Sequence, residues 1–314
     1  MKLPRGLSIL VLVAIAAFGA DLLAQTPAGS GATFKSSVSV VTLSAVVRDR
    51  DGRLVSNLTR QDFEVFDSGV SRSIVQFRSD PEPISVALLF DVSGSMDGST
   101  KRSRAQEAAH QLLSWLDPAG DEAALFSFDT ELRQLRPFEK PSMALKLELK
   151  ATIARLRPFG ATSLRDAIAA AAQRVTERGR PRRAVVVLTD GVDTASRLSA
   201  AEVSAAASAI DVPVYILATV SPVDHLGGEF AVDGVSEAIN GDLSDLARWT
   251  GGAFFMASLP SHVSLAVRQI VAELRQQYLI AVEPGETPGW HPLEVRTRDK
   301  RHSVRARSGY FAIS

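Results

Sequence analysis

The chain has 314 residues, of which 46% are hydrophobic and 22% charged, as in ordinary globular proteins rather than in disordered ones. Lysine plus arginine and aspartate plus glutamate each total 35, so the formal net charge is zero and nothing in the balance calls for nucleic acid as a partner. The sequence contains no cysteine, which excludes disulfides, thiolate metal sites and cysteine nucleophiles.

The first 24 residues have the pattern of a secretory signal peptide. Lys2 and Arg5 precede an apolar run from Ser8 to Ala20 that is too short to span a bilayer comfortably, and small residues follow it. An uncleaved membrane anchor is the alternative, but Asp21 interrupts the apolar run early. We therefore expect residues 1–24 to be a signal peptide, the protein to be secreted or periplasmic, and membrane contact to occur only through that peptide.

A linker and one β region are expected before the central part of the chain. Residues 25–33 are rich in Pro, Gly and Ser and predict a flexible linker. Residues 34–80 then alternate apolar and polar side chains, and Asp51-Gly52 predicts a tight hairpin turn. The Asp80–Pro83 segment ends this region because X-Pro pairs resist continuing a regular element. The pattern predicts an N-terminal antiparallel β module over 34–80.

Residues 84–276 change to apolar strands that alternate with amphipathic helices. Continuous apolar runs, typical of strands buried on both faces, occur at 86–90, 123–128, 184–188, 212–217 and 253–256. Apolar residues at helical spacing occur over 105–116, 145–156, 164–175 and 263–274. The alternation predicts an α/β fold with a doubly wound, mostly parallel sheet.

The last part of the chain, 277–314, reverts to β. Three antiparallel strands are expected, at 278–282, 293–295 and 304–311. Neither terminal β region is large enough to be stable alone. We expect the two ends to form one β-sandwich with the α/β domain inserted between them, and two separate β appendages are the alternative.

Oxygen-bearing side chains follow the predicted strands at one edge of the central sheet. Asp91, Ser93 and Ser95 lie on one loop after the run 86–90, Thr162 directly precedes a helix, and Asp190 follows the run 184–188. In doubly wound sheets, ligands collect at the carboxyl ends of strands. Magnesium favours octahedral oxygen ligation with few carboxylates. The sequence therefore predicts a metal site at this edge.

This set of residues resembles the metal-ion-dependent adhesion site of the von Willebrand factor type A domain, which combines Asp-x-Ser-x-Ser with a distant Thr and a distant Asp. The resemblance covers roughly residues 84–274 and implies a Rossmann-like fold and an Mg²⁺, Mn²⁺ or Ca²⁺ cofactor. It implies that Ser93 and Ser95 ligate directly, and that Thr162 and Asp190 exchange between direct and water-mediated contact. Asp91 would orient waters or ligate.

The whole chain is also similar to secreted bacterial proteins related to this family. The residues that carry the similarity are Asp62-Phe63-Glu64-Val65 near the start and Arg307-Ser308-Gly309-Tyr310-Phe311 near the end. The resemblance implies no defined biochemical activity for the group as a whole.

Further residues are assigned supporting roles around the metal loops. Gly94 lets the backbone fold closely enough for the two serines to converge, and Asp193 either supports the site from outside the metal shell or is a solvated turn carboxylate. Asp97 and Asp166 are expected to be solvated turn carboxylates. Ligand choice is expected to come from surrounding loops, and the residues proposed there are Met96, Asp97, Phe159, Ser163 and the segment Ser221–Gly241.

The predicted site favours binding over catalysis. Two carboxylates leave little surplus negative charge around a divalent cation, so an Asp or Glu of a protein partner would complete its shell favourably. None of the five histidines, His110, His225, His262, His291 and His302, lies on the metal loops as a general base. His110 falls beside an apolar helical stripe and is expected to be partly buried.

Two alternatives stay open: a structural or assembly role for the β-sandwich in which the metal is incidental, and a metal-dependent hydrolase. The arginines within 178–183 and 296–307 are interpreted as solvated loop and strand residues rather than as a polyanion site.

Overall fold

The computed structural model describes residues 40–97, 99–209, 211–221 and 237–312. The predicted signal peptide and linker, and most of Ser221–Gly241, lie outside the described residues. None of the helices in the described part of the chain combines the length and the apolar character needed to cross a membrane.

A six-stranded sheet forms the centre of the structure, in the order β10-β9-β8-β5-β6-β7. Its strands are β5 (Ile84–Asp91), β6 (Glu122–Phe128), β7 (Leu132–Glu139), β8 (Arg182–Thr189), β9 (Val214–Thr219) and β10 (Phe254–Ala257). Every neighbouring pair is parallel except β6 with β7. The prediction of a doubly wound, mostly parallel sheet is confirmed, and the chain order changes direction at β5, which lies between β8 and β6.

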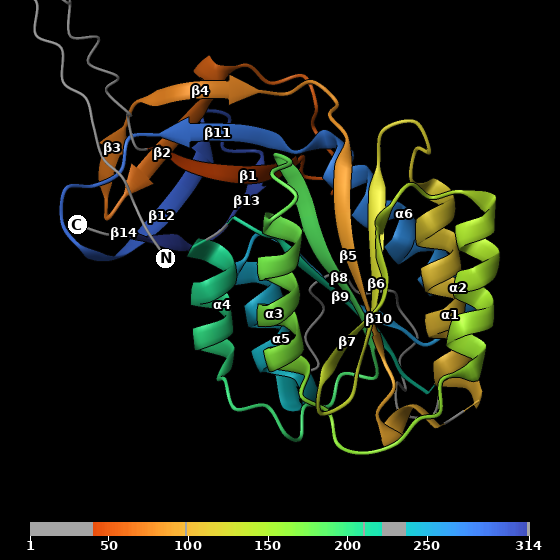
Figure 1. Ribbon diagram of the computed structural model, residues 1–314. Helices are drawn as coiled ribbons and strands as arrows, with labels where there is room; N and C mark the ends of the chain where they lie inside the picture. Colours follow the sequence, from red (N-terminus) through yellow and green to blue (C-terminus); the bar gives the residue numbers. More distant parts are fainter. Residues whose placement is uncertain (1–39, 98, 210, 222–236, 313–314) are drawn as a thin grey trace, which may run out of the picture. The chain divides into compact units, whose positions relative to one another are not determined.

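Helices cover both faces of this sheet (Figure 1). They are α1 (Ser99–Trp115), α2 (Met143–Arg155), α3 (Leu164–Thr176), α4 (Ala200–Ala209), α5 (Glu237–Trp249) and α6 (Pro260–Gln276). Leu88 and Phe90 of β5 pack into one core with α1 and α6, whereas Ala87 and Leu89 pack into a second core with α3 and α5. Burial on both faces explains why this strand is a continuous apolar run.

Two further sheets are built from both ends of the described chain. The first has the order β13-β1-β11-β4 and the second β14-β12-β2-β3. The strands are β1 (Val41–Arg48), β2 (Phe63–Asp67), β3 (Val70–Arg72), β4 (Ile74–Arg78), β11 (Tyr278–Val282), β12 (Gly289–Thr297), β13 (Ser303–Arg305) and β14 (Gly309–Ala312). All pairs in these sheets are antiparallel.

One apolar core lies between these two sheets. Phe63 of β2, Phe77 of β4 and Tyr278 of β11 pack with ring centroids 4.9–5.8 Å apart. In sequence they come from both ends of the chain, so neither end can complete the core alone. We call this pair of sheets the β module. The predicted boundaries 34–80, 84–276 and 277–314 as domains stay predictions.

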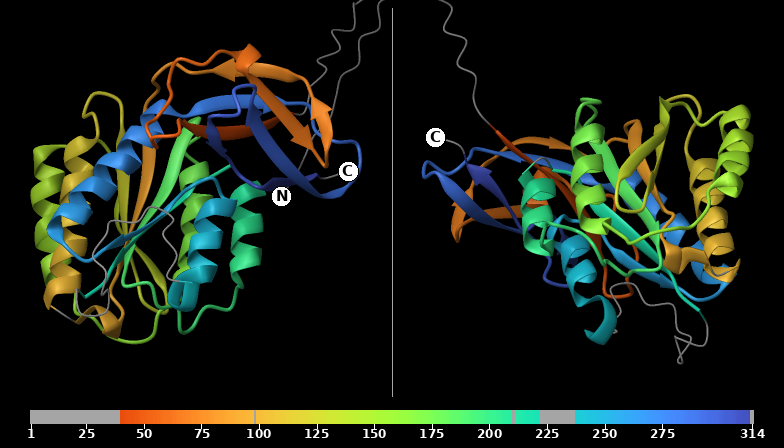
Figure 2. Two further views of the ribbon diagram at one scale, coloured as in Figure 1. Left: turned by 180° about the vertical axis from the view of Figure 1, so that it is seen from behind. Right: turned by 60° about the horizontal axis from the view of Figure 1, so that its bottom comes forward.

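The β module meets the amino ends of the central strands, as the views in Figure 2 also show. Asp211, just before β9, accepts hydrogen bonds from the backbone and hydroxyl of Ser44 in β1. Arg182, at the start of β8, donates to the carbonyl oxygen of Asp80. The carboxyl ends of β5 and β8 are therefore left for the loops of the candidate site.

The prediction of a single strand over 304–311 is wrong. β13 and β14 belong to different sheets, and the chain crosses between them at 306–308. There the side chain of Arg307 is buried and donates to the carbonyl oxygen of Thr42, while Ser308 N donates to Trp249 O.

Candidate metal site

Asp91 ends β5 and is completely buried. Its Oδ1 accepts a hydrogen bond from the backbone N–H of Ser93 at 2.8 Å, and its Oδ2 accepts one from the Thr189 hydroxyl at 2.6 Å. Thr189 comes within reach because β5 and β8 are adjacent parallel strands. Both oxygens of Asp91 are thus engaged, which fixes the orientation of the carboxylate.

Burial and the neighbouring carboxylate of Asp190 both disfavour the charged form of Asp91. Burial raises the pKa of the Asp91 carboxyl to about 6, although the hydrogen bonds from Ser93 and Thr189 oppose the rise. The negative charge of Asp190 adds to it. A cation between these two carboxylates would relieve both effects.

Three loops carry the candidate ligands: the first follows β5 (91–97), the second precedes α3 (156–163) and the third follows β8 (190–199). The two serines of the first loop lie together. Ser93 Oγ and Ser95 Oγ are 3.0 Å apart, and Gly94 between them donates its backbone N–H to the carbonyl oxygen of Gly160 at 3.0 Å. A Cβ at Gly94 would lie 3.4 Å from that same oxygen, so the backbone of the two loops is in close contact here. Gly94 therefore acts through its backbone, by holding the serine loop against the second loop.

Thr162, on the second loop, is buried. Its backbone N–H donates to the Thr194 hydroxyl, and its carbonyl oxygen accepts from the backbone N–H groups of Thr194 and Ala195, each at 2.9 Å. Phe159, earlier on the same loop, donates its N–H to the carbonyl oxygen of Val92 at 2.9 Å. The three loops are thus held together by backbone hydrogen bonds.

Asp190 directly follows β8, and its side chain is only 1% exposed. Its Oδ2 accepts a hydrogen bond from the ammonium of Lys101 at 3.1 Å. Its Oδ1 is buried and has no hydrogen-bond partner among the described residues. A buried carboxylate oxygen without a partner is costly, and a bound cation is one way in which proteins satisfy such a group.

These donors fit a hard divalent cation. They comprise two carboxylates and the hydroxyl side chains of two serines and a threonine, which are ligands that Mg²⁺ accepts when it also keeps water. Within the described residues, three or more His, Asp or Glu side chains nowhere gather in a metal-binding arrangement. The candidate site is thus of the hydroxyl-rich kind that the sequence suggested.

Two carboxylates near the site hold backbone groups in place. The expectation that Asp166 is a solvated turn carboxylate is wrong, and the supporting role considered for Asp193 stays a prediction. Asp193 accepts hydrogen bonds from the backbone N–H groups of Arg165 and Ser196 and from the Ser196 hydroxyl. Asp166 accepts from the backbone N–H groups of Arg197 and Leu198. Both hold the third loop against the start of α3.

The expected ligand-contacting residues divide into two groups. Met96, in the short 3₁₀ helix η2 (Gly94–Asp97), is fully buried against the core under α1, and Ser163 is buried at the start of α3. Their side chains are therefore not presented at the surface, and a contact of these two with a ligand stays a prediction. Asp97 is exposed, and Phe159 is 82% exposed.

Several arginines and one histidine differ from expectation. Arg182 is fully buried and donates to the carbonyl oxygens of Leu274 and Asp80, so the interpretation as a solvated loop residue is wrong for it. Arg178 and Arg180 pair with Glu122. His110 is exposed rather than partly buried.

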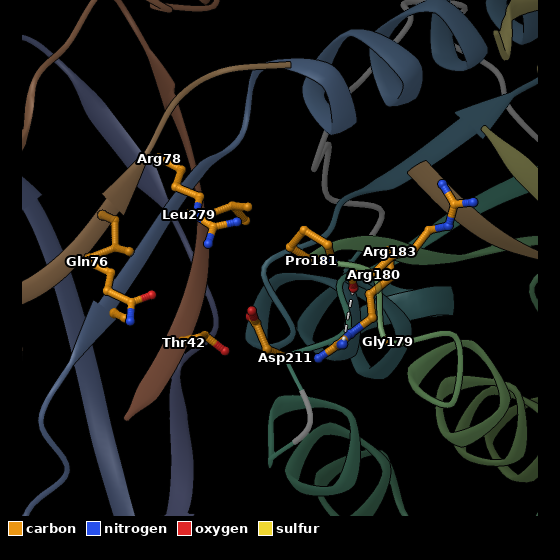
Figure 3. Close-up of a pocket in the computed structure, with 11 residues that line it drawn as sticks. Thr42, Gln76, Arg78, Gly179, Arg180, Pro181, Arg183, Asp211 and Leu279 are labelled. Atoms are coloured by element: carbon orange, nitrogen blue, oxygen red, sulfur yellow. Dashed lines mark hydrogen bonds between the residues drawn. The ribbon is translucent and has the colours of Figure 1, made fainter. Parts of the chain in front are cut away.

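A separate cavity of about 330 Å³ lies at the opposite end of the central strands. On one side it is lined by Arg180, Pro181 and Asp211, and on the other by residues of β1, β4 and β11 (Figure 3). The loop that lines it precedes β8, whereas Asp190 follows that strand. The cavity is part of the contact between the β module and the α/β region, and it does not belong to the candidate metal site.

Sequence reasoning missed Thr189 and Lys101. Thr189 is the residue before Asp190, and its role follows only from the pairing of β5 with β8. Lys101 lies in the first turn of α1, and a basic residue so close to a metal loop was the available signal.

The described geometry can be compared with known proteins. Residues 86–192 match the sequence profile of the von Willebrand factor type A domain. A comparison with curated proteins finds no match.

Solved structures resemble the chain at low sequence identity. A von Willebrand factor type A protein from Catenulispora acidiphila is 15% identical with a TM-score of 0.50, over 88% of this chain and 75% of that one. BatB from Bacteroides thetaiotaomicron is 18% identical with a TM-score of 0.47, over 61% and 98%. Proximal thread matrix protein 1 from the mussel byssus, solved with a zinc-occupied MIDAS motif, is 17% identical with a TM-score of 0.48, over 66% and 50%.

The protein from Catenulispora acidiphila has the same fold as this chain. The sequence profile ends at residue 192, just beyond Asp190. The profile spans the strand, loop and helix sequence from β5 to the end of β8, which contains all five candidate ligands. The chain therefore carries a von Willebrand factor type A domain.

Proposed function

We propose that this protein binds a divalent cation, Mg²⁺ in the first instance, through Asp91, Ser93, Ser95, Thr162 and Asp190. We further propose that the bound ion holds an Asp or Glu side chain of a protein partner, in the periplasm or outside the cell. The observation that carries the proposal is the buried Oδ1 of Asp190. Within the described part of the chain it has no hydrogen-bond partner, and it lies among loops rich in hydroxyl groups.

The chemistry of the donor set supports an acidic ligand. Two carboxylates just neutralise a 2+ ion, and the hydroxyls add no negative charge. Mg²⁺ also tends to keep some of its water ligands, which a further ligand can replace. When bound, the ion supplies an electrophilic position that a carboxylate from outside can fill. The exposed Asp97 and Phe159 lie on the loops around it and would contact the partner's surface.

The same geometry favours binding over hydrolysis. A metal-dependent hydrolase needs a base that is free to take a proton from water. Both oxygens of Asp91 already accept hydrogen bonds, and Asp193 accepts bonds from the backbone of α3 and from Ser196. Neither carboxylate is therefore disposed to act as that base.

Calorimetric titration of metal-free protein with Mg²⁺ tests the first step. We expect one saturable site in the wild type and in Asp97→Ala, whose exposed carboxylate is on the same loop but outside the donor set. We expect no binding in Asp190→Ala. Titration curves that are the same for all three proteins would contradict the proposed site.

Partner capture tests the second step. The purified protein is immobilised and exposed to an envelope extract, with Mg²⁺ or with a chelator. Partners that elute with chelator and are absent from the Asp190→Ala matrix would support the metal-held contact. Capture that survives both changes would favour the structural role of the β module instead.

A further inference from the structure

Lys101 is placed to compete with the proposed metal ion. Its ammonium group donates to Oδ2 of Asp190 at 3.1 Å, across 89 residues of sequence. The Asp190 side chain is 1% exposed, whereas that of Lys101 is 26% exposed. The lysine thus reaches from the surface to a buried carboxylate that is also a proposed metal ligand.

The neighbouring basic residues of α1 are held differently. Arg102 donates to the carbonyl oxygens of Ile153 and Leu156 beside the end of α2, and Arg104 donates to Val220 O at 2.7 Å. These contacts are with backbone and are structural. Among these three residues of α1, Lys101 alone meets a carboxylate of the candidate site.

A divalent cation at Oδ1 of Asp190 and the Lys101 ammonium at Oδ2 would lie only a few ångströms apart, so each weakens the binding of the other. Two like charges a few ångströms apart repel strongly wherever water is partly excluded. Lysine can leave readily, because its ammonium lies on a flexible four-carbon stem and is strongly hydrated. The partly exposed stem of Lys101 provides a path to solvent.

We propose, resting on the proposed function, that Lys101 is an internal counter-ion that occupies Asp190 in the metal-free protein and is displaced when the divalent cation binds. In the metal-free state the ammonium balances the buried charge of Asp190. In the metal-bound state the ammonium moves to the rim of the site, where its positive charge attracts an acidic ligand. Lys101 thus lowers the affinity for the metal and favours a carboxylate as the ligand.

The effect on metal affinity is measured with Mg²⁺ alone. Lys101→Met keeps most of the aliphatic stem and removes the charge, so we expect its Kd for Mg²⁺ to fall by about tenfold relative to the wild type. Lys150→Met is the matched control, because Lys150 is an exposed lysine on α2. We expect the Kd of that variant to be unchanged.

The displacement itself is measured in the wild type, without any substitution. Lysine side chains are acylated briefly with a water-soluble reagent, with and without saturating Mg²⁺, and quantified by mass spectrometry. We expect acylation of Lys101 to increase at least several-fold when Mg²⁺ is added, since the ammonium loses the carboxylate that favours its protonated, unreactive form. Acylation of Lys150 is expected to stay constant.

The outcomes separate this inference from the proposed function. Mg²⁺ binding by the wild type, with the same Kd in Lys101→Met and no change in Lys101 acylation, would overturn the inference and leave the metal site standing. Failure of both the wild type and Lys101→Met to bind Mg²⁺ would overturn both. Binding by Lys101→Met where the wild type binds only weakly would support both.

Discussion

Asp190 combines two properties that a folded protein normally avoids in one side chain. Its carboxylate is almost completely buried, and none of the residues that the structure describes forms a hydrogen bond with one of its oxygens. Such a group costs about 1 to 3 kcal/mol in stability and is kept where a ligand uses it. The hydroxyls of Ser93 and Ser95, 3.0 Å apart, are the uncharged members of the same proposed ligand set.

The substitution Asp190→Asn tests this property. The amide keeps the shape of the side chain and removes its charge. We therefore expect the free energy of unfolding of the metal-free variant to differ from that of the wild type by less than about 1 kcal/mol. Mg²⁺ should raise the melting temperature of the wild type, since it binds only the folded state, and leave that of the variant unchanged. Thermal denaturation with and without 100-fold excess Mg²⁺ measures this. Equal stabilisation of both proteins would contradict the assignment of Asp190.

At this scale the sequence predicts residue types better than contacts. The spacing of the Asp91, Ser93 and Ser95 loop is visible in the chain. The hydroxyl of Thr189 and the ammonium of Lys101 bond to carboxylates 98 and 89 residues away, and no local pattern reports such pairs. Burial of Met96 was also not predictable, because it depends on how η2 turns beneath α1.

A second buried polar group lies in the β module, around His291. One ring nitrogen of His291 is 2.7 Å from Asp67 Oδ1 and the other 2.6 Å from the carbonyl oxygen of Thr287. Two acceptors favour the doubly protonated ring, so the contact with Thr287 and the hydrogen bond to Asp67 raise the pKa of His291. Burial raises the pKa of Asp67, but the bonds from His291 and Tyr310 outweigh it and hold that pKa below its usual value.

These shifts predict a pH dependence of stability. The raised pKa of His291 contributes stability that is fully present below the unfolded value of about 6.5 and is lost as the pH rises through the folded pKa. The lowered pKa of Asp67 contributes stability that is present above about 4 and is lost as the pH falls through its folded pKa. The cluster should stabilise most between these values.

Urea denaturation from pH 5 to pH 9 checks this prediction. The difference in unfolding free energy between the wild type and His291→Gln should shrink as the pH rises. His110→Gln, at an exposed position of α1, serves as the control. A difference that grows with pH would show that His291 is neutral in the folded protein.

At the scale of elements, the site is three loops joined to each other and to the start of α3. Asp193 is central to this arrangement, because it accepts hydrogen bonds from Arg165 N and from Ser196. It touches no proposed ligand, yet it holds the loop that carries Thr194, which bonds to Thr162. Groups that orient ligands from outside commonly change metal affinity when they are removed.

We expect Asp193→Ala to lower stability by about 1 to 3 kcal/mol through the lost hydrogen bonds. We also expect its Kd for Mg²⁺ to rise by about tenfold, because Thr162 is less well held. Urea denaturation and calorimetry measure the two effects. The exposed Asp97→Ala should change neither, and an unchanged Kd for Asp193→Ala would mean that Thr162 is positioned by other contacts.

Helices and strands whose apolar residues follow a clear pattern, either a continuous run or a helical stripe, were predictable from the sequence. Elements without such a pattern were not. The runs that became β5 and β8 are buried on both faces, and α6 has a regular apolar stripe. α4 is rich in alanine and shows little amphipathic period, and the edge strand β7 is mostly half-buried or exposed and contains Pro137. Both were missed because their packing is decided by neighbours rather than by their own pattern.

At the scale of the whole molecule, the β module and the type A domain share a buried charge cluster. Glu273 of α6 is completely buried and pairs with Arg48 of β1 and Arg305 of β13. A buried carboxylate with two guanidinium partners is strongly disturbed when one side of the cluster is removed. The sequence showed the two ends as β, but not that α6 would present this carboxylate to both of them.

Substitution of Glu273 by Ala leaves two arginines without their buried partner. We expect a loss of about 3 to 5 kcal/mol in unfolding free energy. If the cluster couples the two parts, the wild type should unfold in one transition, and the variant should show an earlier loss of the β module. Calorimetry on both proteins measures this. Arg296→Ala, which removes an exposed pair with Glu294, is the control and should cost less than about 1 kcal/mol.

The central claim is that Asp91, Ser93, Ser95, Thr162 and Asp190 hold one divalent cation. Anomalous X-ray diffraction from crystals grown with Mn²⁺ tests it most directly, because the ion is located without reference to any assumed ligand. We predict a single strong peak in contact with the hydroxyls of Ser93 and Ser95 and facing the carboxylate of Asp190. A peak held by other residues, or no peak at saturating Mn²⁺, would contradict the account.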